Sequence, residues 1–226
     1  MSPASPRTAL IAGATGLVGG ACLAQLLREP AYTSVVALVR RPLTVSHRKL
    51  RVELVDVGDL SSLPRLPCDD VFCALGTTIA RAGSQEAFRE VDHHAVVAVA
   101  EVGVRGGAAQ MTMVSSVGAD RPGSNFYLRV KADTEAALGG MPFRALHILR
   151  PGLLLGHRDE ARPAEAMARA LAPGLNLLLQ GPLRRYRAID ADRVGRAMVG
   201  AALEGVEGRH VLQYDDLRRL SSYSRG

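Results

Sequence analysis

Cysteine and long apolar runs are scarce in this chain of 226 residues. Its three cysteines, Cys22, Cys68 and Cys73, are odd in number and lack metal-ligand spacing, which excludes a disulfide scaffold. Low cysteine content indicates a reducing compartment, and we expect the cytoplasm. No apolar run reaches the ~18 residues that a membrane-spanning helix requires. Residues 1–7 lack the apolar segment of a secretory signal and are predicted to form a disordered tail.

Lysine is also scarce, since Lys49 and Lys131 are the only two among 28 basic residues. The net charge of +6 is scattered apart from the run at 184–187, whereas a nucleic-acid binder concentrates its charge on one element. We therefore expect no nucleic-acid partner, and the run is either a solvated loop or a contact in a substrate-binding lobe. His93 and His94 are adjacent on a predicted helix and point about 100° apart, so no metal site is predicted.

A glycine-rich turn separates the first predicted strand from the first predicted helix. The apolar residues 8–12 predict a buried strand, and an apolar-periodic helix follows the turn. Gly13 would permit a tight turn, Gly16 would let the backbone approach a diphosphate, and Gly19 would allow close helix packing. The spacing is G-x-x-G-x-x-G rather than G-x-G-x-x-G, so an ordinary strand–helix turn is the alternative. The residues expected to contact a dinucleotide here are Gly13, Thr15, Gly16, Leu17, Val18 and Gly19.

The end of the second predicted strand, residues 34–39, bears on the choice of coenzyme. Arg40 and Arg41 follow this strand, and Arg40 lies 21 residues after Gly19. Arginine at this position accommodates a 2′-phosphate, whereas an acidic residue would bind the free ribose hydroxyl. The sequence therefore favours NADP(H) over NAD(H), with a solvated loop as the alternative.

Two further loops are expected at the carboxyl edge of the sheet, where open α/β sheets bind their ligands. Asp56 and Val57 follow the third predicted strand and would face the adenine, although Asp56 could equally cap the next turn. Leu75, Gly76 and Thr77 follow the fourth strand in a small polar loop. We expect both loops to contact the coenzyme.

One of the two lysines lies four residues after a tyrosine, so Tyr127 and Lys131 share a face of a predicted helix. A nearby ammonium favours the phenolate form of tyrosine, which lets the hydroxyl exchange protons with a substrate oxygen near neutral pH. Ser115 and Ser116 lie 12 and 11 residues upstream, at the end of a strand, and either hydroxyl could bind the same oxygen. This set suits carbonyl reduction or alcohol oxidation, although an exposed helix pair is the simpler explanation of the spacing.

Strand and helix patterns alternate along the chain, which predicts an α/β fold with a Rossmann-type, doubly wound parallel sheet. We predict a coenzyme-binding core over 8–152 and a small C-terminal substrate lobe over 153–226, within a single domain. A long helix is predicted for about 85–104, another helix for 191–203, and a short strand near 210–214.

With these residues assembled, the chain resembles the short-chain dehydrogenase/reductase superfamily, and within it the atypical Tat-interacting-protein-like oxidoreductase branch. The resemblance covers nearly the whole chain and is carried by five segments, residues 13–19, 75–78, 82–92, 115–131 and 149–156. The middle three of these segments are specific to the branch.

The resemblance implies NADP(H) binding and a Ser-Tyr-Lys catalytic set. Tyr127 would be the acid/base, Lys131 would lower its pKa and hold the nicotinamide ribose, and Ser115 or Ser116 would orient the substrate oxygen. Pro151-Gly152 would border the nicotinamide. The Asn-Ala-Gly motif of other members is absent, and residues 74–76 stand roughly in its place, which leaves the substrate open.

Three functions follow as alternatives. The first is an NADPH-dependent oxidoreductase that reduces a small carbonyl compound, and the second is an NADP(H)-binding regulatory protein without turnover. The third is an epimerase of nucleotide sugars, which would need a larger C-terminal lobe. No membrane partner is expected, and an exposed helix pair would suit a homodimer.

Overall fold

A parallel sheet of seven strands forms the centre of the computed structural model, which describes residues 6–120, 125–156 and 179–223. The strand order is β3-β2-β1-β4-β5-β6-β9, and each neighbouring pair is parallel. Every crossover therefore returns the chain to the same edge, so all strands end together. The predicted Rossmann-type fold is confirmed. The strands are β1 (Arg7–Ala12), β2 (Tyr32–Val39), β3 (Leu50–Leu54), β4 (Asp70–Cys73), β5 (Gln110–Val114), β6 (Ala145–Leu149) and β9 (Gly208–Leu212).

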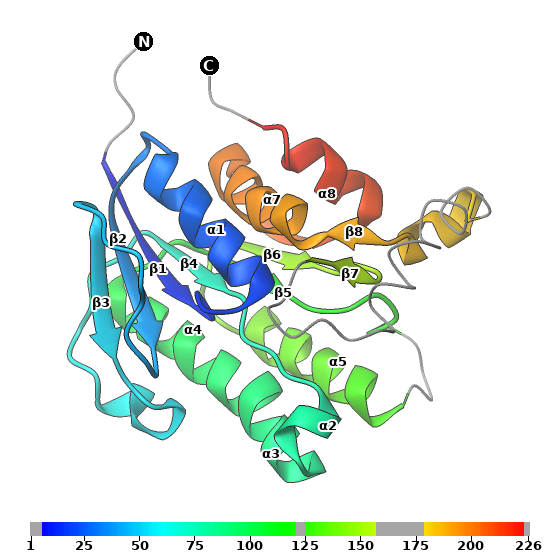
Figure 1. Cartoon of the computed structure of the whole chain (residues 1–226), viewed down its shortest axis with the longest axis horizontal. Helices are drawn as coiled ribbons and strands as arrows, with labels where there is room; N and C mark the ends of the chain where they lie inside the picture. The colour runs from blue at the N-terminus through cyan, green and yellow to red at the C-terminus, as the bar shows by residue number, and fades with distance from the viewer. Residues whose placement is uncertain (1–5, 121–124, 157–178, 224–226) are drawn as a thin grey trace.

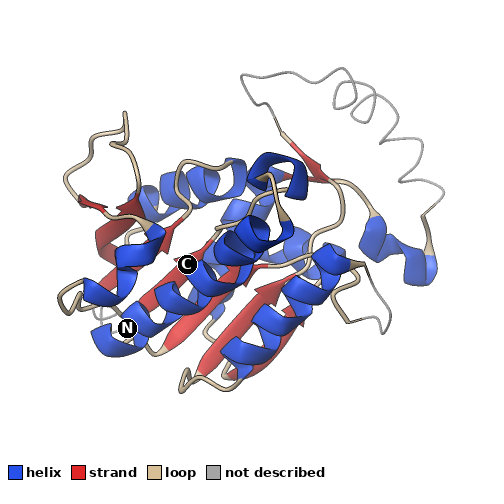
Figure 2. Ribbon diagram, turned by 90° about the horizontal axis from the view of Figure 1, so that it is seen from below, coloured by secondary structure: helices blue, strands red, loops and turns tan. Residues whose placement is uncertain are grey.

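Helices cover both faces of the sheet (Figures 1 and 2). Successive side chains of β1 alternate between the two cores, with Ala9 and Ile11 in one and Leu10 and Ala12 in the other. Because both faces are covered, the inner strands β1, β2, β4, β5 and β6 are largely apolar, whereas the edge strand β3 alternates, with Arg51 and Glu53 between apolar residues. The first core is closed by α1 (Leu17–Arg28), α7 (Ala191–Glu204) and α8 (Tyr214–Leu220), the second by α4 (Ala95–Gly106) and α5 (Phe126–Gly139).

The helix predicted for about 85–104 is present and contains a π-helical turn that the prediction did not include. It consists of α3 (Gln85–Arg89), a π-helical segment η2 (Glu90–His94) and α4. A π-helical turn widens the helix and changes the direction of its side chains, and such turns are frequent at functional sites. The periodicity of apolar residues reports only local sequence. It cannot reveal this π-helical turn, because the turn depends on contacts with elements distant in the sequence.

The segment after residue 152 contributes to the central core as well as to the periphery. The strand predicted near 210–214 is β9, which pairs with β6, and α8 follows it where a strand end was expected. Around the carboxyl edge lie β7 (Leu154–Leu155), β8 (Ile189–Asp190) and the 3-10 helix η3 (Gly181–Tyr186). Residues 157–178 of the predicted lobe lie outside the described residues, as do residues 1–5 of the predicted tail.

Helix α7 packs directly on α1 through glycine. A Cβ at Gly195 would lie 2.6 Å from the Cys22 backbone nitrogen and 2.8 Å from the Val18 carbonyl oxygen, both in α1. A Cβ at Gly200 would lie 2.2 Å from the Leu220 carbonyl oxygen of α8. Any side chain at these two positions would force the three helices apart.

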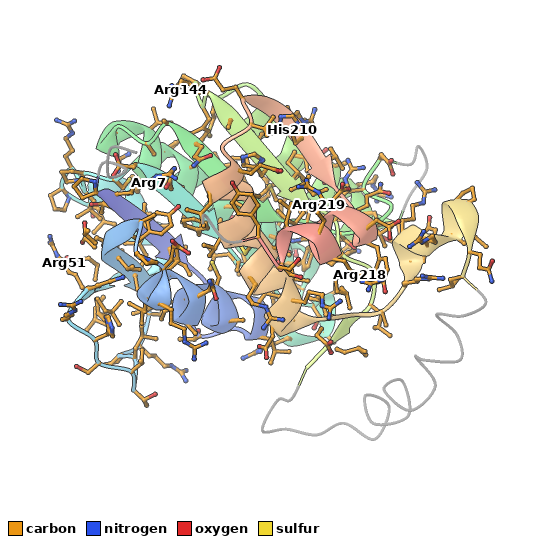
Figure 3. The ribbon with its side chains drawn as sticks, turned by 90° about the horizontal axis from the view of Figure 1, so that it is seen from above. Arg7, Arg51, Arg144, His210, Arg218 and Arg219 are labelled. Atoms are coloured by element: carbon orange, nitrogen blue, oxygen red, sulfur yellow. The ribbon has the colours of Figure 1, made fainter. Side chains whose placement is uncertain are left out.

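A buried network joins the amino ends of four strands. Asp70 accepts hydrogen bonds from Arg7 at 2.5 Å, from the Tyr32 hydroxyl at 2.6 Å and from the Gln110 amide at 2.7 Å. The Gln110 amide also donates to the carbonyl oxygen of Ala202 near the end of α7. Arg7, labelled in Figure 3, therefore belongs to β1 and to this network, which corrects its assignment to a disordered tail.

Candidate functional site

The glycine turn after β1 has the open geometry that an anion requires. Gly13 has φ +88°, and a Cβ there would lie 2.5 Å from the Ala74 carbonyl carbon. A Cβ at Gly19 would collide with the Gly13 carbonyl oxygen, so α1 packs tightly on the turn. A Cβ at Gly16, in contrast, would meet only the Gly13 oxygen at 3.4 Å, so the space beside it is open.

The first amides of α1 point into this open space. Gly16 is the N-cap of α1, no side chain among the described residues caps the helix, and its first turn contains no acidic residue. Thr15 and Gly16 are exposed, Leu17 is half-buried, and Val18 is buried against the core. Uncapped backbone amides at a helix N-terminus bind phosphate groups, so the observed turn fits the diphosphate of a dinucleotide.

The other residues predicted to contact the coenzyme lie at the same carboxyl edge. Arg40 and Arg41 are exposed and directly follow β2. Asp56 is exposed and immediately precedes the 3-10 helix η1 (Val57–Ser62), where its backbone carbonyl accepts a hydrogen bond from the Asp59 amide. A parallel sheet therefore brings the ends of β1, β2 and β3 side by side.

Asp92 joins the loop after β4 to helix α5. Its Oδ1 lies 2.7 Å from Lys131 Nζ, and its Oδ2 accepts a hydrogen bond from the Thr77 amide at 2.8 Å. The side chains of Asp92 and Lys131 are 0% and 5% exposed, so this is a buried ion pair. A Cβ at Gly76 would lie 3.4 Å from Asp92 Oδ1 and 3.6 Å from Lys131 Nζ, so the loop backbone at this glycine packs directly on the buried pair.

The electrostatics of this pair keep the lysine charged. Burial alone would lower the pKa of Lys131, but the charges of Asp92 and then Tyr127 outweigh it and raise the pKa above its ordinary value. Cys73 lies near the pair, and burial raises the pKa of its thiol to about 11. The site therefore holds a permanent ammonium and a protonated, unreactive thiol at neutral pH.

Tyr127 lies in the first turn of α5, whose N-cap is Asn125. Its ring packs against Phe88 of α3 at 5.5 Å between centroids, and Lys131 Nζ lies 6.0 Å from its centroid. The predicted Tyr-Lys pair is thus brought together on one helix face, with the phenol half-buried. The contact with Phe88 restrains the ring, which remains partly exposed.

The two serines after β5 have different environments. Ser115 is buried, and its hydroxyl donates to Glu135 Oε1 at 2.5 Å. Glu135 is in turn bound by both Nε and Nη2 of Arg150, at 2.9 and 2.5 Å. Ser116 is half-buried, and its hydroxyl has only a long contact of 3.4 Å with the Val117 carbonyl oxygen. The Ser115 hydroxyl is therefore engaged in the protein interior, whereas that of Ser116 is available.

Pro151 and Gly152 follow β6 beside the serine loop. The Val117 amide donates to the Pro151 carbonyl at 3.1 Å, which continues the pairing of β5 with β6 beyond the strands. A Cβ at Gly152 would lie 2.5 Å from the Arg187 carbonyl oxygen, so glycine is needed here for the close approach of residues 186–187.

Three buried charged residues at this edge escaped the sequence-based interpretation. The Asp92–Lys131 ion pair and the roles of Glu135 and Arg150 were not anticipated. One signal was present, since Tyr127, Lys131 and Glu135 are spaced by four residues and share a helix face. The acidic partner of a rare lysine could not be identified because Asp92 is 39 residues away.

Comparison with known proteins gives the family. Residues 13–166 match a family model described as NAD(P)H-binding. The mitochondrial protein fmp52 of Emericella nidulans is 34% identical over 206 residues, which cover 87% of each chain. The protein HTATIP2 of Rattus norvegicus is 36% identical over 168 residues, covering 72% of this chain and 69% of the relative.

Solved structures of low identity share the fold. MoeE5 in complex with UDP-glucose and NAD superposes with a TM-score of 0.67 at 21% identity, covering 92% of this chain and 75% of that chain. The human epimerase family protein SDR39U1 with NADPH gives a TM-score of 0.63 at 18% identity, covering 90% and 73%. Neighbours of this fold thus include both NAD and NADPH complexes.

The expected cytoplasmic location is wrong, since the fungal relatives are named mitochondrial proteins. The inference failed because few cysteines indicate a reducing environment and do not distinguish one reducing compartment from another. Within the described residues, no helix combines the length and apolarity needed to cross a bilayer. By its matched residues and its relatives, the chain belongs to the NAD(P)H-binding family and has the Rossmann-type fold of short-chain dehydrogenases/reductases.

Proposed function

We propose that this protein is an NADPH-dependent oxidoreductase that reduces a small carbonyl compound. The observation that carries the proposal is the convergence of an uncapped, glycine-lined helix N-terminus with a buried ammonium beside a half-buried phenol. The first feature suits a diphosphate, and the second suits proton transfer to an oxygen. Both lie at the carboxyl edge of one parallel sheet.

The residues of the glycine turn would hold the diphosphate, and Lys131 would bind the ribose next to the nicotinamide. Leu75, Gly76 and Thr77 would border the coenzyme, because the Thr77 amide is anchored to the same carboxylate as Lys131. When bound, reduced nicotinamide supplies a hydride to a carbonyl carbon. Asp56 and Val57 would lie beside the adenine, and Pro151 and Gly152 beside the nicotinamide.

Arg40 and Arg41 support NADPH over NADH. Both follow β2 as exposed side chains, where a guanidinium could form two parallel hydrogen bonds to a 2′-phosphate. Among the family's structural neighbours, SDR39U1 was solved with NADPH and MoeE5 with NAD, so the arginines and not the fold favour the phosphorylated coenzyme.

The proton for the product comes from Tyr127 in this proposal. As the carbonyl carbon gains the hydride, the carbonyl oxygen takes the phenol proton and the substrate leaves as an alcohol. Lys131 stabilises the resulting phenolate by its fixed positive charge. Because Asp92 raises the pKa of Lys131, the ammonium keeps its proton, and Tyr127 must be reprotonated from solvent.

Ser116, and not Ser115, is proposed to orient the substrate oxygen. The spacing in the sequence left the two equivalent, but the Ser115 hydroxyl already donates its proton to Glu135. A hydroxyl has a single proton to donate, so Ser115 could not also bind a substrate oxygen without breaking that bond.

Replacement of the phenol tests the proposal. Tyr127→Phe should abolish NADPH oxidation with a panel of aldehydes and quinones while NADPH affinity stays within about threefold, because the hydroxyl acts only on the reacting oxygen. Tyr214→Phe is the matched control, since Tyr214 is also half-buried but lies on α8 and should keep full activity. Normal turnover by Tyr127→Phe would disprove the assignment.

The same experiment separates the other two functions. Tight NADPH binding by the wild-type chain without turnover of any carbonyl would indicate a regulatory role. Conversion of a nucleotide sugar with no net coenzyme oxidation would indicate an epimerase.

A further inference from the structure

A second buried charged cluster lies two helical turns beyond Tyr127. Glu135 is 1% exposed and Arg150 is 7% exposed, and neither is a member of the proposed Ser-Tyr-Lys set. Two guanidinium nitrogens of Arg150 bind the Glu135 carboxylate, and the third, Nη1, lies 3.1 Å from Asp120 Oδ2. One arginine thus uses all three of its nitrogens on acidic partners from two different elements.

The two acidic partners of Arg150 lie on the two elements that carry the proposed catalytic groups, helix α5 and the serine loop. Glu135 is on α5, on the same face as Tyr127 and Lys131, and also accepts the Ser115 hydroxyl. Asp120 lies five residues after Ser115 in the connection from β5 to α5, which also contains Ser116. Arg150 itself directly precedes Pro151, at the end of β6.

We propose that Arg150 is a positioning residue that holds the Ser116 loop at a fixed distance from Tyr127. This inference rests on the proposed function, because it assigns the relative placement of Ser116 and Tyr127 to one guanidinium. Residues 115–120 of the loop are held on one side of Ser116 by the Ser115–Glu135 hydrogen bond and on the other by the Arg150–Asp120 ion pair. Helix α5 is held by the bidentate Arg150–Glu135 pair.

Physical considerations support arginine for this task. A guanidinium is planar and presents its donors in a rigid fork, so the direction of its bonds to Glu135 fixes the direction in which Nη1 points. The Glu135 hydrogen bond, outweighing burial, raises the pKa of Arg150, so the group stays charged at all working pH values. Lysine could reach one acidic partner but could not fix the angle between two.

Backbone contacts alone leave this loop under-determined. The Val117 amide bonds to the Pro151 carbonyl, and the Ala119 amide donates to Ser116 within the loop. The first of these ties the loop to β6, and the second is internal. Within the described part of the chain, the hydrogen bonds and ion pairs of Glu135 and Arg150 therefore link this loop to α5.

The ion pair between Arg150 and Asp120 can be removed with little effect on the core. Asp120 is 44% exposed, so Asp120→Ala removes one ion pair while the buried Arg150–Glu135 pair remains. Asp133→Ala is a matched control, because Asp133 is 48% exposed and pairs with Arg89 at 3.0 Å, also from α5 but away from the loop. Asp120→Asn keeps an oxygen that can accept the guanidinium hydrogen bond and tests for rescue.

The first measurement is steady-state reduction of the aldehyde and quinone panel. Asp120→Ala should lower kcat about tenfold with the KM for NADPH unchanged, because misplacement of a catalytic group by a fraction of an ångström costs rate rather than coenzyme binding. Asp120→Asn should recover most of the rate, and Asp133→Ala should behave as wild type. An unchanged kcat in Asp120→Ala would overturn the proposal.

The second measurement needs no turnover and separates the failure of this inference from the failure of the proposed function. Amide hydrogen exchange across residues 115–120, followed by mass spectrometry with NADPH present, should be about tenfold faster in Asp120→Ala and in Glu135→Gln than in Asp133→Ala. If the wild-type chain reduces no carbonyl but this exchange difference is found, the proposed function is wrong, and the proposal that Arg150 restrains the Ser116 loop is supported. Equal exchange in all variants would show that Arg150 does not restrain the loop.

Discussion

Asp70 and Asp92 are both buried carboxylates, but they lie at opposite edges of the same sheet. Asp70, at the amino edge, accepts from Arg7, Tyr32 and Gln110, and each of these partners begins a strand. Asp92, at the carboxyl edge, binds one loop amide and one ammonium that adjoins a phenol. The first carboxylate holds the fold together, whereas the second holds a charge where the coenzyme and substrate are proposed to meet.

The position of the edge explains this division. The carboxyl ends of parallel strands are followed by the loops that bind ligands, and the amino ends are closed by returning helices. Burial raises the pKa of Asp70, against the opposing influence of Arg7, yet its network is saturated by protein donors. At Asp92 the protein supplies two contacts, from the Thr77 amide and from Lys131, and the loop backbone at Gly76 lies directly against the pair.

The largest effect is expected at the amino edge. Asp70→Ala should lower the free energy of unfolding by about 3–5 kcal/mol, because it leaves Arg7, Tyr32 and Gln110 without their buried acceptor. Urea denaturation measures this loss. The affinity of the folded variant for NADPH should be unchanged, and a weaker affinity would mean that the two edges are not independent.

His147, in the middle of β6 between the two edges, should add an acid-dependent loss of stability. Burial, and then the charge of His210, lower the pKa of His147 to about 4. Between about pH 6.5, the ordinary pKa of histidine, and about pH 4, His147 is protonated in the unfolded chain but stays neutral in the folded chain. The free energy of unfolding should therefore fall by about 3 kcal/mol from pH 6.5 to pH 4 and be unaffected by this group above pH 6.5.

Comparison of urea denaturation at pH 7 and pH 4.5 in wild type and His147→Gln checks this expectation. The variant lacks the titrating ring and should lose less stability on acidification. His210 and Glu204 are present in both proteins, so the difference between the two losses reports the His147 ring together with its charge coupling to these neighbours. An equal loss in both would exclude His147 as the source.

At the carboxyl edge, Asp92→Asn should reduce kcat about 100-fold, because Lys131 loses its fixed position and its stabilised charge. The pH dependence identifies the cause. Asp92 raises the pKa of Lys131, so the ammonium and its stabilising effect persist below the ordinary pKa and are lost only as pH rises through the raised value. Without Asp92, burial lowers that pKa, and the alkaline limb of the kcat profile should move to lower pH. A parallel loss at every pH would point instead to misfolding.

The smallest effect is expected at the end of β2. Arg40→Ala should weaken NADPH binding about tenfold, or by about 1.5 kcal/mol, and leave NADH binding unchanged, because only the phosphorylated coenzyme uses a guanidinium there. Calorimetry with both coenzymes measures it, and Arg48→Ala, an exposed arginine of the same connection, is the control. Equal weakening for both coenzymes would show that Arg40 does not read the 2′-phosphate.

The two edges also differ in how far they can be predicted from the sequence. The glycine turn, the strand ends and the Tyr127–Lys131 pair are local patterns, so periodicity and spacing were sufficient to propose them. Asp92 could not be paired with Lys131 because the contact depends on the π-helical turn Glu90–His94 and on how α5 packs against it. Ser115 and Ser116 could not be distinguished because the difference lies in Glu135, which reaches the strand end only in the folded chain.

The C-terminal helix α8 was missed although its sequence carries a signal. Gln213 and Asp216 form a capping box, which stabilises a helix of only seven residues. The preceding apolar residues suggested a strand that continues through this point, and β9 in fact ends at Leu212. Short polar helices are easily overlooked when apolar periodicity is the main criterion.

The glycine contacts of α7 make the coenzyme half of the molecule dependent on residues far beyond it. Gly195 rests on the backbone of α1, so the position of the helix whose amides are proposed to bind the diphosphate depends on the last quarter of the chain. A fragment that ends at Gly152 would expose the apolar side of α1 and forfeit the final strand of the sheet. Chimeras that exchange this quarter between relatives should therefore inherit coenzyme affinity from the donor of α7 as well as from the donor of the glycine turn.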